Sequence, residues 1–201
     1  MFVLGGQDFS VAPNPLYPGY CPPSPAPGVP PPPCPPFVPA STFFNDVWRS
    51  SDGVHWEETA AHAPWQPRAG LSAIVFKGWI YVLGGSLGDD AAIGGTGRLL
   101  FNDVWRSRDG AAWELVTPAA GWSPRPGHQC QVLFETFLCF GGFGFPTNPF
   151  VPAHPRYLWA SRDGASWTQV SDAPWSAGGP EGVKYDFDSL VVRGDGLEGL
   201  M

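Results

Sequence analysis

The chain has little charge and almost no lysine. Charged residues make up 14% of its 201 residues, and the only lysines are Lys77 and Lys184. The formal net charge is −7, and the nine arginines are spread along the chain without forming a cluster. Because phosphate backbones are bound by clustered lysine and arginine, this composition argues against nucleic acid as a partner.

Long apolar runs and helical periodicity are also missing. No stretch approaches the roughly 20 apolar residues that a membrane span requires, so none is expected. No charged segment followed by an apolar core opens the chain, so no secretory signal is recognised. The abundant residues are glycine (26), proline (25), phenylalanine (14) and tryptophan (10). Such a composition is typical of many short strands joined by turns.

One segment occurs three times. The pattern Phe-Asn-Asp-Val-Trp-Arg-Ser-x-Asp-Gly-x-x-Trp is found at 44–56 and 101–113, with a weaker copy at 157–167. The tryptophans Trp48, Trp105 and Trp159 are separated by 57 and then 54 residues. A repeat of this length is typical of propeller blades.

The rest of the unit recurs at the same spacing. A Pro-Arg-x-Gly segment contains Arg68 in one unit and Arg125 in the next, and a Gly-Gly pair ends an apolar run at 84–85 and at 141–142. Between these markers lie two short apolar runs, 71–76 and 79–83, joined by Lys-Gly, which predicts a hairpin. With strands at 102–107 and 112–116, each unit is expected to contain four antiparallel strands.

A four-stranded unit with these features resembles the kelch repeat of β-propellers, such as the central domain of galactose oxidases. The Ser-x-Asp-Gly-x-x-Trp turns are similar to a shortened form of the Asp-box hairpin of sialidase-type propellers. The resemblance implies that the recurring residues form the scaffold: aspartates stabilise turns, glycines allow positive φ, and the second tryptophan of each turn packs against neighbouring strands. These residues are Trp48, Asp52, Gly53, Trp56, Arg68, Gly84, Gly85, Trp105, Asp109, Gly110, Trp113, Arg125, Gly141, Gly142, Trp159, Asp163, Gly164 and Trp167.

The expected fold is therefore all-β, a partial propeller of about three four-stranded kelch-like blades in one region, 1–201. Residues 1–66 form an incomplete blade that lacks its first strand, 67–123 and 124–178 form blades, and 179–201 begin another. Residues 185–193 are expected as a first strand and 197–201 as the start of a second. Because propellers have four to eight blades, two explanations stay open: a fragment of a longer ring, or a homodimer that completes one.

Residues 11–40 interrupt the first unit. They contain 14 of the 25 prolines, which cannot extend a sheet and favour a polyproline II path. The segment is interpreted as a solvated spacer, with a docking ligand or a wall-type sequence as the alternative.

The four cysteines form two candidate pairs. Aligning the hairpin that contains Cys130 and Cys139 with the one at 71–83 places these two residues opposite each other, within reach of a disulfide. Two small buried thiols are the alternative. Cys21 and Cys34 flank the proline-rich stretch and could staple it. Paired cysteines would favour an extracellular or lumenal location, and unpaired ones the cytoplasm.

No catalytic, cofactor or metal site is predicted. The histidines lack a carboxylate or nucleophile at a recognisable spacing, and His128 is expected to make a turn hydrogen bond. Arg68 and Arg125 are assigned a shared structural contact in preference to a sialidase-type arginine cluster. The Asn-Asp pairs at 45–46 and 102–103 are interpreted as strand-entry turns in preference to calcium ligands.

The function favoured by these observations is a non-catalytic binding module or scaffold, which presents its unequal loops to a protein or glycan partner. Two alternatives remain: a carbohydrate-active enzyme or its accessory domain, and a structural component of a larger extracellular or wall assembly.

Overall fold

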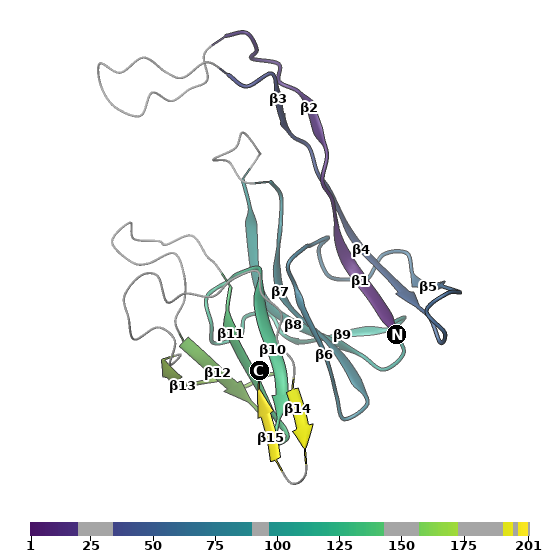
Figure 1. Ribbon diagram of the computed structural model, residues 1–201, viewed down its shortest axis with the longest axis vertical. Coiled ribbons are helices and arrows are strands. Elements are labelled where there is room, and N and C mark those ends of the chain that lie inside the picture. The colour runs from purple at the N-terminus through teal and green to yellow at the C-terminus, as the bar shows by residue number, and fades with distance from the viewer. Residues whose placement is uncertain (20–33, 90–96, 143–156, 173–190, 195–196, 201) are drawn as a thin grey trace.

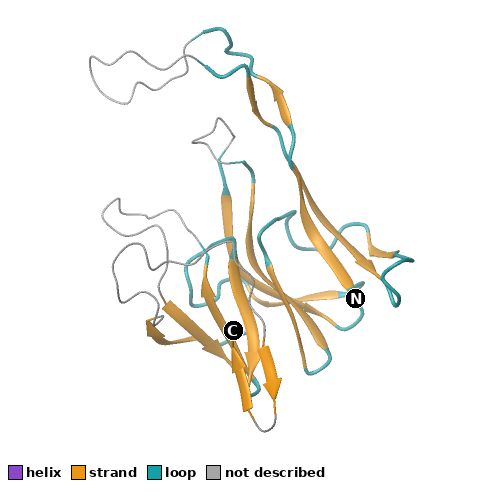
Figure 2. Ribbon diagram, in the orientation of Figure 1, coloured by secondary structure: helices purple, strands orange, loops and turns teal. Residues whose placement is uncertain are grey.

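The computed structural model of the chain describes residues 1–19, 34–89, 97–142, 157–172, 191–194 and 197–200. Within these residues the secondary structure is all β, with fifteen strands and no helix (Figure 1, Figure 2). None of the described segments therefore forms a helix long and apolar enough to cross a membrane.

The strands form three antiparallel sheets, one protruding ribbon and one terminal hairpin. The first sheet contains β1 (Phe2–Asp8), β4 (Thr42–Arg49) and β5 (Glu57–Ala60), in that order. The second contains β6 (Ser72–Phe76), β7 (Trp79–Leu87), β8 (Leu99–Ser107) and β9 (Trp113–Thr117). The third contains β10 (His128–Leu133), β11 (Thr136–Gly141), β12 (Tyr157–Ser161) and β13 (Thr168–Asp172). The ribbon pairs β2 (Val11–Pro13) with β3 (Phe37–Pro39), and the terminal hairpin pairs β14 (Val191–Gly194) with β15 (Leu197–Leu200).

The second and third sheets are meanders that begin with tight hairpins. Lys77 and Gly78 connect β6 to β7 and both have positive φ, 49° and 75°. Phe134 and Glu135 connect β10 to β11 with φ of 47° and 55°. Two central residues with positive φ match the right-handed twist of the flanking strands, so these turns fix the register of each hairpin.

The cores lie between the sheets. Along β7, Tyr81 and Leu83 point to a cluster shared with the third sheet, whereas Val82 points to a cluster shared with the first. Successive side chains of a strand face opposite sides, so this alternation buries both faces of the second sheet. The rings of Tyr81 and Phe137 of the third sheet pack edge to face at a centroid distance of 4.9 Å.

Two of the three Gly-Gly pairs lie inside strands, whereas β11 ends at Gly141 as expected. β7 continues through Gly84 and Gly85 to Leu87, and β1 likewise passes through Gly5 and Gly6. The strand register shifts at both pairs, between Leu83 and Gly85 and between Leu4 and Gly6. The glycines adopt positive φ there, so each pair forms a β-bulge inside a strand instead of the expected strand end.

The edges of the proline-rich segment are also strands. Contrary to the expected polyproline path, β2 and β3 pair as a two-stranded ribbon that extends beyond the first sheet (Figure 1). Both strands of such a ribbon are edges, where a proline need not supply a ladder hydrogen bond, and Pro13 and Pro39 occupy them. Residues 20–33 of this segment lie outside the described residues.

The described residues near the end of the chain form a hairpin. β14 overlaps the end of the strand expected at 185–193, and it pairs with β15 in an antiparallel hairpin. Residues 185–190 lie outside the described part of the chain. Both strands of the terminal hairpin contact β10 of the third sheet.

The bulges offer a matched test of how closely the sheets pack. Gly6 and Gly85 hold the same place in their bulges, with φ of 114° and 102°. An alanine Cβ at Gly85 would lie 2.9 Å from the carbonyl oxygen of Ala69, whereas one at Gly6 meets nothing within 4 Å. Both substitutions carry backbone strain, but only Gly85→Ala adds a backbone clash. We expect Gly85→Ala to lower the free energy of unfolding by about 1–3 kcal/mol more than Gly6→Ala in urea denaturation. Equal losses would contradict this packing.

Candidate functional site

Each Ser-x-Asp-Gly-x-x-Trp turn is closed by its own hydrogen bonds. Ser107 Oγ accepts from the Gly110 N–H at 2.9 Å, and Asp109 Oδ1 accepts from the next two backbone N–H groups at 2.9 and 3.0 Å. Trp113 Nε1 donates back to the Gly110 carbonyl at 2.9 Å. The turns at 50–56 and 161–167 repeat this pattern.

These bonds stabilise the ionised carboxylates. Backbone N–H groups from Ala112 and Ala111 lower the pKa of Asp109 below its ordinary value. The pKa of Asp52 is lowered as well, first by its bond with the His55 ring and then by backbone N–H groups. A general acid at neutral pH needs a raised pKa, so these two aspartates suit a turn better than proton transfer.

The tryptophan that ends each Ser-x-Asp-Gly-x-x-Trp turn packs differently in the three units. Trp113 contacts Trp65 edge-on at a centroid distance of 5.9 Å, and Trp167 contacts Trp122 edge-on at 4.3 Å. Trp56 remains exposed, because the described residues place no sheet on that side of the first sheet. The expectation that Trp56 packs against neighbouring strands is therefore wrong for this copy.

A buried ion pair joins two repeated positions of the second sheet. The Arg68 side chain is fully buried, and its Nη1 and Nη2 donate to the two oxygens of Asp103 at 2.6 and 2.9 Å. Trp105 Nε1 donates to the same carboxylate at 2.7 Å, and Arg68 Nη1 also donates to the Gly84 carbonyl at 3.0 Å. This bidentate geometry is the strong form of an arginine–carboxylate contact.

The Asn-Asp pairs thus lie inside strands and are not strand-entry turns. Asn102 and Asp103 belong to β8, and Asn102 Nδ2 donates to the carbonyls of Ala120 and Trp122 at 3.1 and 2.8 Å. Asn45 makes the equivalent bonds from β4. These amides tie each sheet to the connection that leads to the next one.

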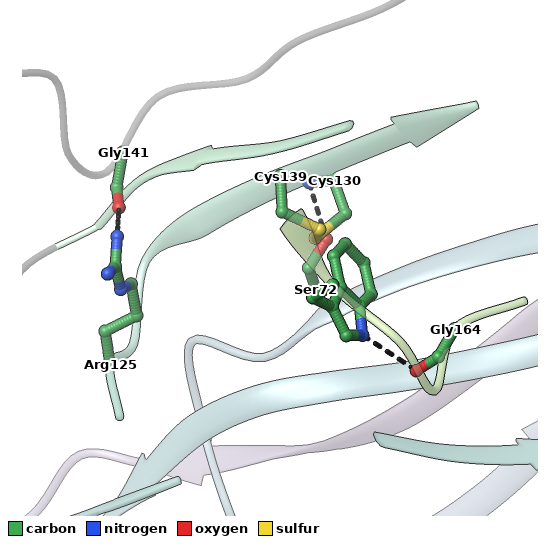
Figure 3. The surroundings of a disulfide bond; sticks show 7 residues. Ser72, Arg125, Cys130, Cys139, Gly141 and Gly164 are labelled. Carbon is green, nitrogen blue, oxygen red and sulfur yellow. Dashed lines mark hydrogen bonds between the residues drawn. A yellow bond between two sulfur atoms is a disulfide. The ribbon is translucent and has the colours of Figure 1, made fainter. Parts of the chain in front are cut away.

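The third sheet keeps the arginine but not the carboxylate. The strand register pairs Cys139 with Trp159 as it pairs Val82 with Trp105, so Tyr157 stands where the second sheet has Asp103. Arg125 Nη1 donates to the Gly141 carbonyl at 3.0 Å, as Figure 3 shows, and its other bonds go to the carbonyl and hydroxyl of Ser123. Burial lowers the pKa of Arg125 to about 10.

His128 also differs from its counterpart in the preceding unit, Leu71. It is fully buried, and within the described structure neither ring nitrogen has a hydrogen-bond partner, so the expected turn hydrogen bond is wrong. Burial, and then the charge of Arg125, lower the pKa of His128 to about 3, while the Arg125 carbonyl opposes the shift without reaching hydrogen-bond geometry. The ring lies against Gly84, where an added Cβ would come within 2.7 Å of it.

The cysteines are oxidised where the structure describes them. Cys130 and Cys139 face each other across β10 and β11 and form a disulfide with a Cα–Cα distance of 4.2 Å (Figure 3). Cys34 is disulfide-bonded too, while Cys21 lies outside the described residues. The Cys130 N–H donates to Ser72 Oγ of the second sheet at 3.0 Å, which links the neighbouring hairpins.

Two open hollows lie on the first sheet. One, of about 530 Å³, is lined by Met1, Phe2, Arg49, Ser50, Ser51, His55, Trp56 and Glu57. The other, of about 370 Å³, is lined by Phe43, Phe44, Asn45, Asp46, Glu58, Ala61, His62 and Pro67. Asp46 there accepts from Trp48 Nε1 at 2.7 Å. In the described ranges, no group of three or more histidine, cysteine, aspartate or glutamate side chains is placed to hold a metal ion.

Buried His128 should make the fold sensitive to mild acid. Its folded pKa is about 3 against an ordinary value of 6.5, so between these values the unfolded state binds the extra proton. The contribution of His128 to the free energy of unfolding is therefore fully present above pH 6.5. It falls as the pH drops toward 3, with a slope of about 1.4 kcal/mol per pH unit. His128→Leu, which restores the residue of the preceding unit, should remove this slope in denaturation curves taken from pH 7 to 4.5. An unchanged slope in His128→Leu would refute the assignment.

Comparisons with known proteins give little beyond this geometry. No family model matches the chain, and no curated protein matches it. Among solved structures, a chain described as "Structure of YjhT" is similar, with 17% sequence identity and a TM-score of 0.49. The match covers 65% of this chain and 46% of that one, so the chain spans less than half the length of YjhT.

Proposed function

We propose that the chain forms about three kelch-type propeller units and acts as a non-catalytic binding module for a protein or glycan partner. The units at 67–123 and 124–178 correspond to the second and third sheets, and 1–66 and 179–201 to an incomplete unit at each end. The proposal is supported by the recurrence of whole sets of contacts, such as the turn bonds of Asp109 and Asp163, at one place in each sheet.

The observation that carries the binding role is the protruding β2–β3 ribbon. Phe9, Val11 and Phe37 are each more than half exposed on or next to it. Several exposed large apolar side chains on one protruding element are typical of an interaction site. The base of the ribbon is fixed, because Asp89, two residues after the end of β7, accepts hydrogen bonds from the Ser41 backbone N–H and hydroxyl at 2.8 and 2.7 Å.

The differences between the units also fall at one end of the sheets. Residues 9–41, 88–98 and 142–156 all connect a second strand to a third, and these connections differ in length and sequence. The opposite end has two-residue hairpins in both complete units. Loops that vary on a constant scaffold are where binding residues are usually found.

The repeated charged groups support a binding role over catalysis. The Asp109 carboxylate accepts backbone hydrogen bonds within its turn, and Asp103 and Arg68 form an ion pair. The Cys130–Cys139 disulfide favours an oxidising compartment, extracellular or lumenal, for this module.

The binding role is tested on paired peptide and glycan arrays. The wild-type protein should bind a defined set of ligands without converting them, and the double variant Phe9→Ser/Phe37→Ser should lose at least 10-fold in affinity. Phe134→Ser, which removes an exposed phenylalanine from the hairpin end, is the matched control and should bind normally. Turnover of any bound glycan, or equal binding by the double variant, would refute the proposal.

The first sheet suggests how the units assemble. Val3 occupies the place of Val82 and Cys139 in the other sheets, yet it is 49% exposed where those residues are 0% and 3% exposed. In the second and third sheets this face is covered by the preceding sheet. We propose that this face of the first sheet is covered either by a second copy of the chain, docked head to tail so that two copies complete a ring, or by a further unit of a longer propeller.

The assembly is tested by solution mass. If a second copy is the cover, the wild type should be a dimer, and Val3→Glu should shift it to a folded monomer, because the charge would be buried in the new interface. Val75→Glu, which changes an exposed valine on β6, should leave the dimer intact. A wild-type protein that is folded and monomeric at micromolar concentration would exclude ring completion by a second copy.

A further inference from the structure

We propose that the third sheet holds a binding site for a small carboxylate anion, formed by the guanidinium of Arg125 and the indole N–H of Trp159. The site stands at the place where the second sheet carries its own carboxylate, Asp103. It is independent of the partner proposed for the ribbon.

The second sheet shows what a filled site looks like. The carboxylate of Asp103 accepts three hydrogen bonds, two from the Arg68 guanidinium at 2.6 and 2.9 Å and one from Trp105 Nε1 at 2.7 Å. The first sheet repeats the last of these, since Asp46 accepts from Trp48 Nε1 at 2.7 Å. A carboxylate beside the strand tryptophan is thus common to both of these sheets.

The third sheet keeps the donors. Trp159 replaces Trp105 in register, and its buried Nε1 has no hydrogen-bond partner among the described residues. Arg125 keeps the equivalent bond to the Gly141 carbonyl, but its remaining bonds reach only the neutral oxygens of Ser123. Tyr157, at the aspartate position, is exposed and supplies no anion.

This arrangement leaves a buried charge without a counter-charge. The Arg125 residue is only 3% exposed, and no described carboxylate contacts it. An arginine removed from water is costly unless an anion pairs with it. The second sheet meets that cost with its own aspartate, whereas the described residues of the third sheet supply no carboxylate to Arg125.

The donor geometry favours a carboxylate over other anions. Two guanidinium N–H groups and one indole N–H matched the two oxygens of an aspartate in the second sheet, and a planar fork suits a planar carboxylate. Because Arg125 is almost enclosed, the ligand must be small, close to acetate in the size of its buried part.

Acetate is the probe, and thermal unfolding is the measurement. Sodium acetate is titrated against sodium chloride at constant ionic strength and neutral pH. The wild type should show a saturable rise in Tm of about 2–4 °C with acetate, because a ligand that binds only the folded state stabilises it. Chloride should have no such effect.

Two substitutions at one position make the test specific. Tyr157→Asp supplies the missing carboxylate, so it should raise Tm without ligand and abolish the acetate response. Tyr157→Asn introduces a side chain of the same shape as aspartate but without its charge, so this variant should keep the acetate response. Arg125→Gln should abolish it, and if that variant fails to fold, the Tyr157 pair decides the question alone.

Three outcomes would overturn the site: no acetate response in the wild type, an equal response to chloride, or an unchanged response in Tyr157→Asp. None of them bears on the ribbon, whose arrays use different ligands and different variants. A failure here and a failure of the binding module are therefore distinguishable.

Discussion

Burial of both faces of the second sheet is the constraint on which the rest of the structure depends. Val82 of β7 packs against the first sheet, and Tyr81 and Leu83 pack against the third, so the second sheet buries apolar side chains on both faces. Since no sheet in such a stack can bury its own side chains alone, stability is shared across the contacts between neighbours. The glycine bulge of β7 also serves close packing, because a Cβ at Gly84 would lie 2.7 Å from His128 of the third sheet and one at Gly85 would lie 2.9 Å from the Ala69 carbonyl oxygen.

The polar residues obey the same constraint. A buried sheet end needs its hydrogen bonds satisfied, and the chain does so with Asn102 on the connection and Asp103 on the arginine. In the third sheet Tyr157 replaces the acid, and His128 replaces an apolar residue. The result is two unmatched groups, Arg125 and His128, in one buried region where the second sheet has none.

Much of the local structure is predictable from the sequence. The hairpins at 71–83 and 128–141, the facing positions of Cys130 and Cys139, and the turns at Asp109 and Asp163 depend on neighbouring residues, and alternation and turn chemistry encode them. The replacement of Asp103 by Tyr157 is also visible in the aligned repeats. Its consequence is not, because the partner arginine lies far away in the chain.

The errors have a common physical origin. The bulge at Gly84 and Gly85 is defined by the pairing of β7 with β8. In the sequence alone, the end of the apolar run before these glycines is therefore mistaken for the end of the strand. The sequence around His128 predicts a turn residue, but the ring is buried against Gly84 of the second sheet. Trp56 has the same sequence context as Trp113, but its burial depends on a sheet that the described residues do not provide. Each of these properties belongs to a contact between units.

The two ends of the sheets differ in how much change they tolerate, which explains where the unequal features gather. A two-residue hairpin with positive φ at both positions fixes the strand register, so an insertion at Lys77 or Phe134 would shift every side chain of β7 or β11 to the wrong face. The connections from β1 to β4 and from β7 to β8 have no such restriction, because closing a longer loop adds only about 0.6 kcal/mol per doubling of length. The ribbon could therefore grow out of the first sheet without disturbing the core. Arg125 lies at this same end, next to the point where β11 leaves the sheet at Gly141. The unequal loops and the missing carboxylate partner of Arg125 thus lie at one end of the sheets. The two-residue hairpins lie at the opposite end, where the strand register tolerates no insertion.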